Sequence, residues 1–317
     1  MLTYRYILIF LFLFNQSLVA QEREAVDITF NSNGHAISGK MLKPRETPKQ
    51  LPALVFLVGS GGGASYRTNY ETFLQEFFEN SLPSDGFVLL YFDKRGLGES
   101  EGKWFRSTFE DRATDANAAG LFLKSQSFVD PNKIFVVGHS QGAWVAQVSL
   151  SKYPDTFAGG ISMSGAIHSV EKQLVSDYES EYYCEGGLDR ELSHVKATKK
   201  AKRNIKLVSI LPISKNLKHM KLIRSFDSKP YVRGITKPML FMFGENDNLV
   251  YPEWSKDGLN EIYGDSIPSY FDIEIIEGVD HGFKETAFCR TEPYSNLKRS
   301  QKAKELVRSW LLTQTGR

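Results

Sequence analysis

The stretch Val136-Val137-Gly138-His139-Ser140-Gln141-Gly142-Ala143-Trp144 decides the fold. It joins an apolar run to residues that can begin a helix, and it places one serine between two glycines. Glycines two residues before and two residues after the serine leave room for a tight strand-to-helix turn, where backbone and side chains come close together. The sequence therefore predicts a buried strand, a turn that exposes the hydroxyl of Ser140, and a helix that continues to about Lys152.

Further apolar runs alternate with predicted helices on both sides of this turn. Strands are expected at residues 53–58, 86–92, 133–137, 157–163, 238–243 and 271–276, and helices at 70–79, 110–124, 141–152 and 303–311. Continuous rather than alternating hydrophobicity indicates strands buried on both faces, as in a parallel sheet. Residues 25–42 alternate around Asn33-Gly34 and predict an antiparallel hairpin. The fold class is therefore α/β, with a doubly wound, mostly parallel sheet and an N-terminal hairpin.

The composition suits a globular protein and gives no support to a nucleic-acid partner. The chain has 317 residues, 41% of them hydrophobic and 24% charged, and its formal net charge is only +2.

The N-terminus differs from the rest: one cation, Arg5, precedes an apolar run at residues 7–14 and a polar stretch at 21–24. This pattern predicts a signal peptide at residues 1–20 and a secreted or periplasmic protein. An uncleaved anchor is the alternative, although the run is shorter than the roughly 20 residues of a membrane span.

Residues 166–232 interrupt the alternation and are predicted to be a helical cap inserted into a single domain of residues 21–317. Between Leu192 and Phe226 there are ten Lys or Arg residues, no Asp or Glu, and many interleaved apolar residues. One interpretation is a solvated cap with ordinary packing. The other is a lid with an apolar face over the serine and a cationic outer face that contacts anionic lipid.

A serine hydroxyl needs a base to remove its proton, and the chain offers one at a matching position. Asp247 follows the predicted strand that ends at residue 243, and His281 follows the last predicted strand. Both should lie at the same sheet edge as Ser140, and the order serine, aspartate, histidine is the one used on this architecture. Asp280 and Glu245 are weaker candidates for the orienting carboxylate.

Together with the segment Asp93-Lys94-Arg95-Gly96-Leu97-Gly98-Glu99-Ser100, the motif Gly-His-Ser-Gln-Gly resembles the α/β-hydrolase superfamily, in its bacterial serine esterase-like branch. The resemblance implies that Ser140 is the nucleophile, His281 the general base and acid, and Asp247 the carboxylate that orients the imidazole. It further implies hydrolysis of a small-molecule carboxylic ester through an acyl-enzyme, with no metal or organic cofactor. Thioesterase and aminopeptidase-like amidase activity use the same apparatus and stay open.

The resemblance also implies an oxyanion hole made of two backbone N–H groups. Gln141, directly after the nucleophile, is the first candidate. Many relatives have His-Gly-x after the first buried strand, whereas this chain has Val58-Gly59-Ser60. The second donor is therefore expected to be the N–H of Ser60, with Gly61 as the alternative.

Two interpretations from other classes compete with this one. Residues 59–64 also fit the G-x-G-x-x-A dinucleotide fingerprint, and Asp93 ends the next strand, which together would suit an NAD-dependent oxidoreductase. A non-catalytic binding protein could use the same fold. Neither explains why Ser140, Asp247 and His281 occur in this order.

Two points are left undecided by the sequence. Cys184 and Cys289 either form a disulfide in an oxidising compartment or remain as two free thiols. The sequence also gives no indication of the oligomeric state.

Overall fold

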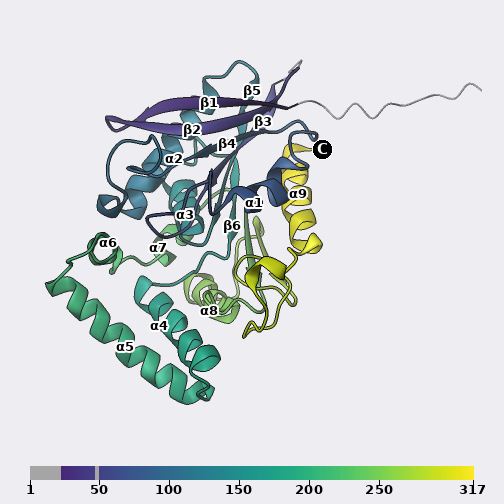
Figure 1. Ribbon diagram of the computed structural model, residues 1–317. Helices are drawn as coiled ribbons and strands as arrows, with labels where there is room; N and C mark the ends of the chain where they lie inside the picture. Colours follow the sequence, from purple (N-terminus) through teal and green to yellow (C-terminus); the bar gives the residue numbers. More distant parts are fainter. Residues whose placement is uncertain (1–22, 47–49) are drawn as a thin grey trace, which may run out of the picture.

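The computed structural model describes residues 23–46 and 50–317, and an eight-stranded sheet forms its centre (Figure 1). The strands are β1 (Arg23–Ser32), β2 (His35–Pro44), β3 (Leu51–Leu57), β4 (Val88–Phe92), β5 (Val129–His139), β6 (Gly159–Met163), β7 (Met239–Gly244) and β8 (Phe271–Ile276). Their order across the sheet is β1-β2-β4-β3-β5-β6-β7-β8. Strands β3 to β8 are parallel, and the β1–β2 hairpin joins the sheet by antiparallel pairing of β2 with β4. The predicted fold class is confirmed.

The expected helices are present, and further ones follow β6. The helices are α1 (Glu71–Leu74), α2 (Phe109–Lys124), α3 (Gln141–Lys152), α4 (Val170–Ser180), α5 (Arg190–Ile210), α6 (Lys215–Ile223), α7 (Lys229–Arg233), α8 (Pro252–Tyr263) and α9 (Gln301–Thr315), with single turns η1 (Gln75–Glu79), η2 (Trp104–Arg106), η3 (Glu181–Glu185) and η4 (Tyr294–Asn296). The helix expected at 70–79 is α1 continued by the π-helical turn η1. None of the helices in the described residues is long and apolar enough to cross a membrane. The predicted signal peptide lies outside the described residues.

The sheet has a hydrophobic core on each face, which explains the continuous apolar runs. Val55 of β3 and Val136 of β5 belong to the core that α2 and α3 cover. Phe56 and Val137, one residue further along, belong to the core under α1, η1 and α9. Successive side chains of a strand point to opposite faces, so a strand between two helical layers must be apolar at every position.

The β1–β2 hairpin is closed by the predicted turn. Asn33 and Gly34 have φ values of 48° and 79°, and Ser32 pairs with His35 across the turn. Asparagine and glycine tolerate this left-handed backbone better than other residues, so this dipeptide fixes the register of the hairpin.

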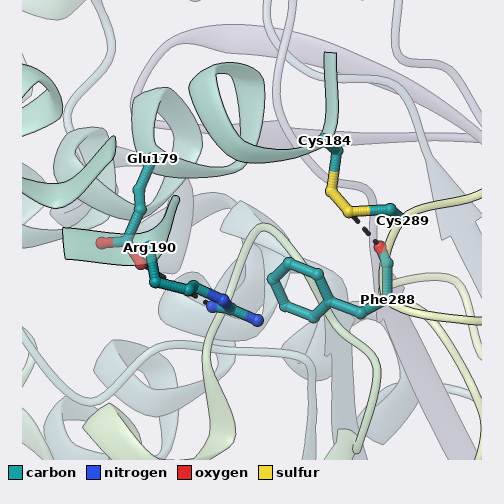
Figure 2. Close-up of a disulfide and its surroundings, with 5 residues drawn as sticks. All are labelled: Glu179, Cys184, Arg190, Phe288 and Cys289. Atoms are coloured by element: carbon teal, nitrogen blue, oxygen red, sulfur yellow. Dashed lines mark hydrogen bonds and ion pairs between the residues drawn. A yellow bond between two sulfur atoms is a disulfide. The ribbon is translucent and has the colours of Figure 1, made fainter. Parts of the chain in front are cut away.

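Helices α4 to α7 lie between β6 and β7 in the chain, and Figure 1 shows α4, α5 and α6 together beyond one end of the sheet. We call the helices α4 to α6, with the turn η3, the cap. A disulfide joins Cys184 of η3 to Cys289, in the segment that follows β8 (Figure 2). The bridge therefore ties the cap to the main domain.

Aromatic and charged groups surround this bridge. The guanidinium of Arg190 lies 4.1 Å from the ring centroid of Phe288, next to Cys289, and 3.7 Å from a carboxylate oxygen of Glu179 on α4 (Figure 2). Arg190 begins α5, so this cluster fastens the start of the long cap helix to the same segment that the disulfide reaches.

Candidate active site

Ser140 lies on the predicted turn, between the last residue of β5 and the first residue of α3. Its backbone has φ 58° and ψ −127°, a combination that a non-glycine residue rarely adopts. A Cβ on Gly138 would lie 2.0 Å from the carbonyl oxygen of Gly142, and a Cβ on Gly142 would lie 2.0 Å from the carbonyl oxygen of Leu57. Both glycines are therefore required by close packing of the backbone around the serine.

Asp247 and His281 come together at the same end of the sheet, in the loops after β7 and β8. Nδ1 of His281 lies 2.8 Å from Oδ2 of Asp247. The other carboxylate oxygen of Asp247 accepts hydrogen bonds from the N–H groups of Leu249 and Val250, at 2.9 and 2.8 Å. Asp247 is fully buried, so both of its oxygens are fixed in place. With Nδ1 bound to Asp247, Nε2 is the ring nitrogen of His281 that can accept a proton.

The surroundings of His281 act on its pKa in two directions. Burial acts to lower the pKa, but the charge and hydrogen bond of Asp247, with smaller contributions from Asp280 and Asp177, outweigh it and raise the pKa above its ordinary value. The carboxyl group of Asp177 on α4 has its own pKa raised to about 6, mainly by burial. The imidazole is thus more basic than that of a free histidine.

A chain of hydrogen bonds runs from the His281 loop to the loop after β3. Nε2 of His139 lies 2.8 Å from the carbonyl oxygen of His281, and Nδ1 of His139 lies 2.8 Å from the hydroxyl of Tyr70. That hydroxyl accepts the N–H of Gly59 at 2.9 Å. Because a carbonyl can only accept, His139 donates from Nε2 and accepts from Tyr70 at Nδ1, so every donor in the chain has an acceptor.

A cavity of about 170 Å³ opens beside the serine. Its polar lining residues are Ser60, Ser140, Gln141, Ser164, Gln173, Asp177 and His281, and its apolar ones are Trp144, Ala166, Val170, Leu174, Met220, Ile223, Leu249 and Val250. Ser140 and His281 therefore face one space, together with both residues predicted to supply the oxyanion donors. Helices α4 and α6 provide much of the apolar wall, so the cap completes the cavity.

The structure distinguishes among the candidates for the second oxyanion donor. The N–H of Gly59 is used by Tyr70, whereas within the described chain neither Ser60 nor Gln141 donates its backbone N–H to another group. Ser60 lines the cavity that contains Ser140, and Gly61 lines a smaller one together with Lys94 and Arg112. This geometry favours Ser60 over Gly61.

The alternative carboxylates have other partners. Oδ1 of Asp280 accepts the N–H groups of Gly282 and Lys284, and Glu245 accepts the N–H of Gly278. Both therefore shape the loop that holds His281, and Asp247 alone of the three contacts its imidazole within the described residues.

The dinucleotide interpretation fails on local geometry. A phosphate-binding fingerprint places its glycines at the N-terminus of a helix, where unpaired N–H groups can bind pyrophosphate. Here the glycines are followed by turns, and α1 begins only at Glu71. Within the described residues, no three His, Cys, Asp or Glu side chains are grouped so as to hold a metal ion.

Three functional contacts were missed by sequence reasoning. Tyr70 lies in a predicted helix, Asp177 in the cap, and Lys94 in the segment that carries the family resemblance, and only Lys94 had a motif that could have pointed to it. The contacts of all three depend on residues distant in the chain, which a single sequence does not place.

Comparisons with known proteins agree with this architecture. The family model described as Hydrolase_4, serine aminopeptidase S33, matches residues 52–283. The quorum-quenching protein AidA of Acinetobacter baumannii is 26% identical over 152 residues, which cover 44% of this chain and 47% of AidA. An acetylxylan esterase of Coprinopsis cinerea is 29% identical over 146 residues, which cover 43% of this chain and 37% of that protein. The matched segments span less than half the length of these two relatives.

Among solved structures, the esterase Pf2001 of Pyrococcus furiosus aligns with a TM-score of 0.63 and 20% identity. The alignment covers 92% of this chain and 91% of that one. At this identity the likeness establishes a shared fold over nearly the whole chain.

Proposed function

The chain belongs to the serine aminopeptidase S33-like family of α/β-hydrolases, and we propose that it hydrolyses carboxylic esters of small molecules through an acyl-enzyme on Ser140. The observation that carries the proposal is the shared cavity: Ser140 and His281 line it together, and His281 is hydrogen-bonded to the buried Asp247. A strained serine, a basic imidazole and an orienting carboxylate form the arrangement that activates a hydroxyl for acyl transfer.

In the proposed reaction, Oγ of Ser140 attacks the ester carbonyl while Nε2 of His281 takes the hydroxyl proton. Asp247 holds Nδ1–H and stabilises the imidazolium that forms. The N–H groups of Ser60 and Gln141 bind the oxyanion, and one such donor is worth roughly 3 kcal/mol. The leaving alkoxide then takes the proton from His281, and water releases the acid by the same steps.

Labelling with a fluorophosphonate probe tests the nucleophile. We expect the wild-type protein to be labelled at Ser140 and to hydrolyse p-nitrophenyl butyrate, and we expect Ser140→Ala to lose both properties. Ser309→Ala is the control and should keep both properties, because Ser309 is exposed on α9, its hydroxyl donates to the carbonyl of Leu306, and it does not line this cavity. Labelling that persists in Ser140→Ala would refute the assignment.

The nature of the cavity supports esters with an apolar acyl group. Val170, Leu174, Met220 and Ile223 of the cap face the space beside the serine. The same apparatus can cleave thioesters and amides, so one purified sample should be assayed with short and long acyl esters, acyl-CoAs and aminoacyl amides. A preference for either of the last two classes in kcat/KM would replace the ester proposal.

We also propose a secreted or periplasmic location. The disulfide between Cys184 and Cys289 supports it, because such bridges persist in oxidising compartments. Fractionation of cells that express the full chain tests the proposal, and recovery of the protein with its N-terminus intact in the cytosol would oppose it.

The cap supports a further proposal, contact with the surface of an anionic bilayer. Ile210 and Ile213, at the end of α5 and in the connection to α6, are 71% and 74% exposed. Leu207 and Leu211 are more than half exposed beside them, and the segment from Leu192 to Phe226 carries ten cations and no acidic residue. We call the surface formed by these four apolar residues the cap tip. Exposed apolar side chains among cations suit an interface with anionic lipid headgroups.

Vesicle sedimentation tests the cap tip. We expect binding to vesicles of phosphatidylglycerol and phosphatidylcholine but not to phosphatidylcholine alone, and we expect Ile210→Ser/Ile213→Ser to weaken it by about tenfold or more, since each side chain buried in lipid contributes roughly 1–3 kcal/mol. Leu121→Ser is the control, because Leu121 is a 51% exposed apolar residue on α2. Equal binding to both vesicle types, or an unaffected double variant, would contradict the proposal.

A further inference from the structure

Two buried cationic side chains hold the loop after β3 by its carbonyl groups. Nζ of Lys94 donates to the carbonyl oxygens of Gly59 at 3.0 Å and Gly61 at 2.7 Å. Nη2 of Arg112 donates to the carbonyl oxygen of Val58 at 2.6 Å. In the described part of the chain, neither cation forms an ion pair with a carboxylate, so the loop carbonyls are their principal partners.

The position of Lys94 determines where the next N–H group points. The peptide between Gly59 and Ser60 is trans, so its carbonyl and its N–H point in opposite directions. Lys94 lines a smaller cavity of about 10 Å³ together with Gly61 and Arg112, and it is absent from the lining of the cavity that contains Ser140. The N–H of Ser60 therefore points to the other side of the loop.

That other side is the side of the nucleophile. A Cβ on Gly59 would lie 3.2 Å from the Cβ of Ser140, so the loop passes directly beside the serine. Ser60 shares the larger cavity with Ser140 and His281. The N–H of Gly59, the neighbouring donor, is already bound by Tyr70. The loop is thus fixed from one side by Lys94 and Arg112 and from the other by Tyr70.

We propose that Lys94 is a positioning residue for the oxyanion hole, which aims the N–H of Ser60 at the oxyanion by holding the carbonyls of Gly59 and Gly61. The inference rests on the proposed acyl transfer at Ser140. Lys94 does not line the cavity that contains Ser140, so in this proposal it acts through the peptide that it binds. A donor that is already oriented needs no reorganisation as charge develops, and a hydrogen bond on the carbonyl of an amide strengthens its N–H as a donor.

The hydrogen bonds of Lys94 to the loop do not require its positive charge. Burial and the nearby Arg112 lower the pKa of Lys94 to about 6, although Asp93 acts in the opposite direction. A neutral amine still donates two hydrogens, so both carbonyl contacts can persist above that pH. Positioning at neutral and alkaline pH therefore depends on the two N–H donors.

Replacement of the amine by an apolar chain of similar length tests the proposal. For Lys94→Met we expect kcat on p-nitrophenyl butyrate to fall about 10- to 100-fold, somewhat less than for loss of an oxyanion donor itself, with KM changed by less than about twofold. The affinity for butylboronic acid, which forms a tetrahedral adduct with serine, should fall by a similar factor. Lys133→Met is the matched control, because Nζ of Lys133 also donates to a backbone carbonyl, that of Thr315 at 2.9 Å, and it should leave kcat unchanged.

Two measurements keep the proposal testable whatever the stability of Lys94→Met. Methylammonium, but not tetramethylammonium, should restore part of kcat to Lys94→Ala, because only the former has N–H donors. In the wild-type protein, the amide proton of Ser60 should move downfield when the boronate adduct forms.

An unshifted Ser60 amide, or a raised KM with unchanged kcat in Lys94→Met, would overturn the proposal. The wild-type enzyme separates this failure from failure of the proposed function. Ester hydrolysis and labelling at Ser140 in the wild type establish the acyl transfer independently of every Lys94 variant.

Discussion

Two neighbouring histidines in this protein have opposite proton positions and opposite pKa shifts. His139 carries its proton on Nε2 for the carbonyl of His281, whereas His281 carries its proton on Nδ1 for Asp247. Burial and the proximity of His281 lower the pKa of His139 well below its ordinary value, so His139 stays neutral. The carboxylates around His281 raise its pKa instead. One ring therefore serves as a fixed hydrogen-bonding link, and the other is suited to exchange protons.

The carboxyl of Asp177 gives a prediction about pH dependence. Ester hydrolysis requires neutral His281, so kcat/KM should rise with pH through its raised pKa. Above a pH of about 6 Asp177 becomes ionised and favours the imidazolium. Asp177→Asn removes this charge, lowers the pKa of His281 and should move the rise in kcat/KM to lower pH. A pH profile of kcat/KM measures the shift.

The control for this prediction is Glu171→Gln. Glu171 lies on the same helix, α4, but is exposed. Glu171→Gln should therefore leave the pH profile of kcat/KM unchanged. A profile for Asp177→Asn that coincides with the wild type, or moves to higher pH, would show that Asp177 does not act on the imidazole.

The three proposed catalytic residues lie just after the carboxyl ends of three parallel strands. Ser140 follows β5, Asp247 follows β7 and His281 follows β8, and parallel strands bring these ends to one edge. Helix α3 begins directly at Gln141, so the same turn that strains the serine also frees the next N–H. This tight strand-to-helix turn depends on close backbone contacts between β3, β5 and α3.

Gly142 is one of the two glycines in this turn that have no room for a side chain. A Cβ there would lie 2.0 Å from a backbone oxygen at the end of β3, which no side-chain rotation can relieve. We expect Gly142→Ala to reduce the free energy of unfolding by about 1–3 kcal/mol or more, because it overpacks the contact. Urea unfolding followed by circular dichroism measures the loss.

Gly63→Ala is the stability control for Gly142→Ala. Gly63 lies in a loop, and a Cβ there would meet nothing within 4 Å. We expect its free energy of unfolding to stay within about 0.5 kcal/mol of the wild type, as for most surface substitutions. Equal effects of the two substitutions would mean that the turn tolerates a side chain.

The sequence predicted the local features of the fold and the strand ends that carry the site, but not the contacts between distant elements. Periodicity and glycine spacing predicted the parallel strands, the hairpin and the turn at Ser140, because these features are local. Strand order then placed Asp247 and His281 near each other. The motif at residues 93–100 could have drawn attention to Lys94, but the partners of Lys94 and Tyr70 could not be predicted, since they depend on how the loop after β3 packs against distant elements. The pairing of Cys184 with Cys289 likewise required the position of the cap.

At the scale of the whole molecule, the cap is a helical unit with a small hydrophobic core of its own. Its own core contains only a few residues, Val175, Ala197 and Ala201, with partly buried neighbours. It nevertheless supplies one wall of the substrate cavity through α4 and α6. The disulfide and the Arg190 cluster fasten it to the segment that follows the His281 loop (Figure 2). We therefore expect loss of the bridge to affect the stability of the fold and the wall of the cavity.

Removal of the bridge tests this link. The cysteines are 105 residues apart, and closing a loop of this length in the unfolded chain is worth up to about 4–5 kcal/mol. We expect Cys184→Ser/Cys289→Ser to lower the free energy of unfolding by about 2–4 kcal/mol, as is typical for native bridges. Chemical denaturation of both proteins with and without reductant measures the difference.

Reductant serves as the internal control, because it should lower the stability of the wild type toward that of the double variant and leave the variant itself unchanged. If the bridge also fixes the cavity wall, the variant should lose discrimination between short and long acyl esters well below its melting temperature. Retained discrimination together with lowered stability would confine the role of the bridge to the unfolded chain, where a crosslink acts by limiting its conformations.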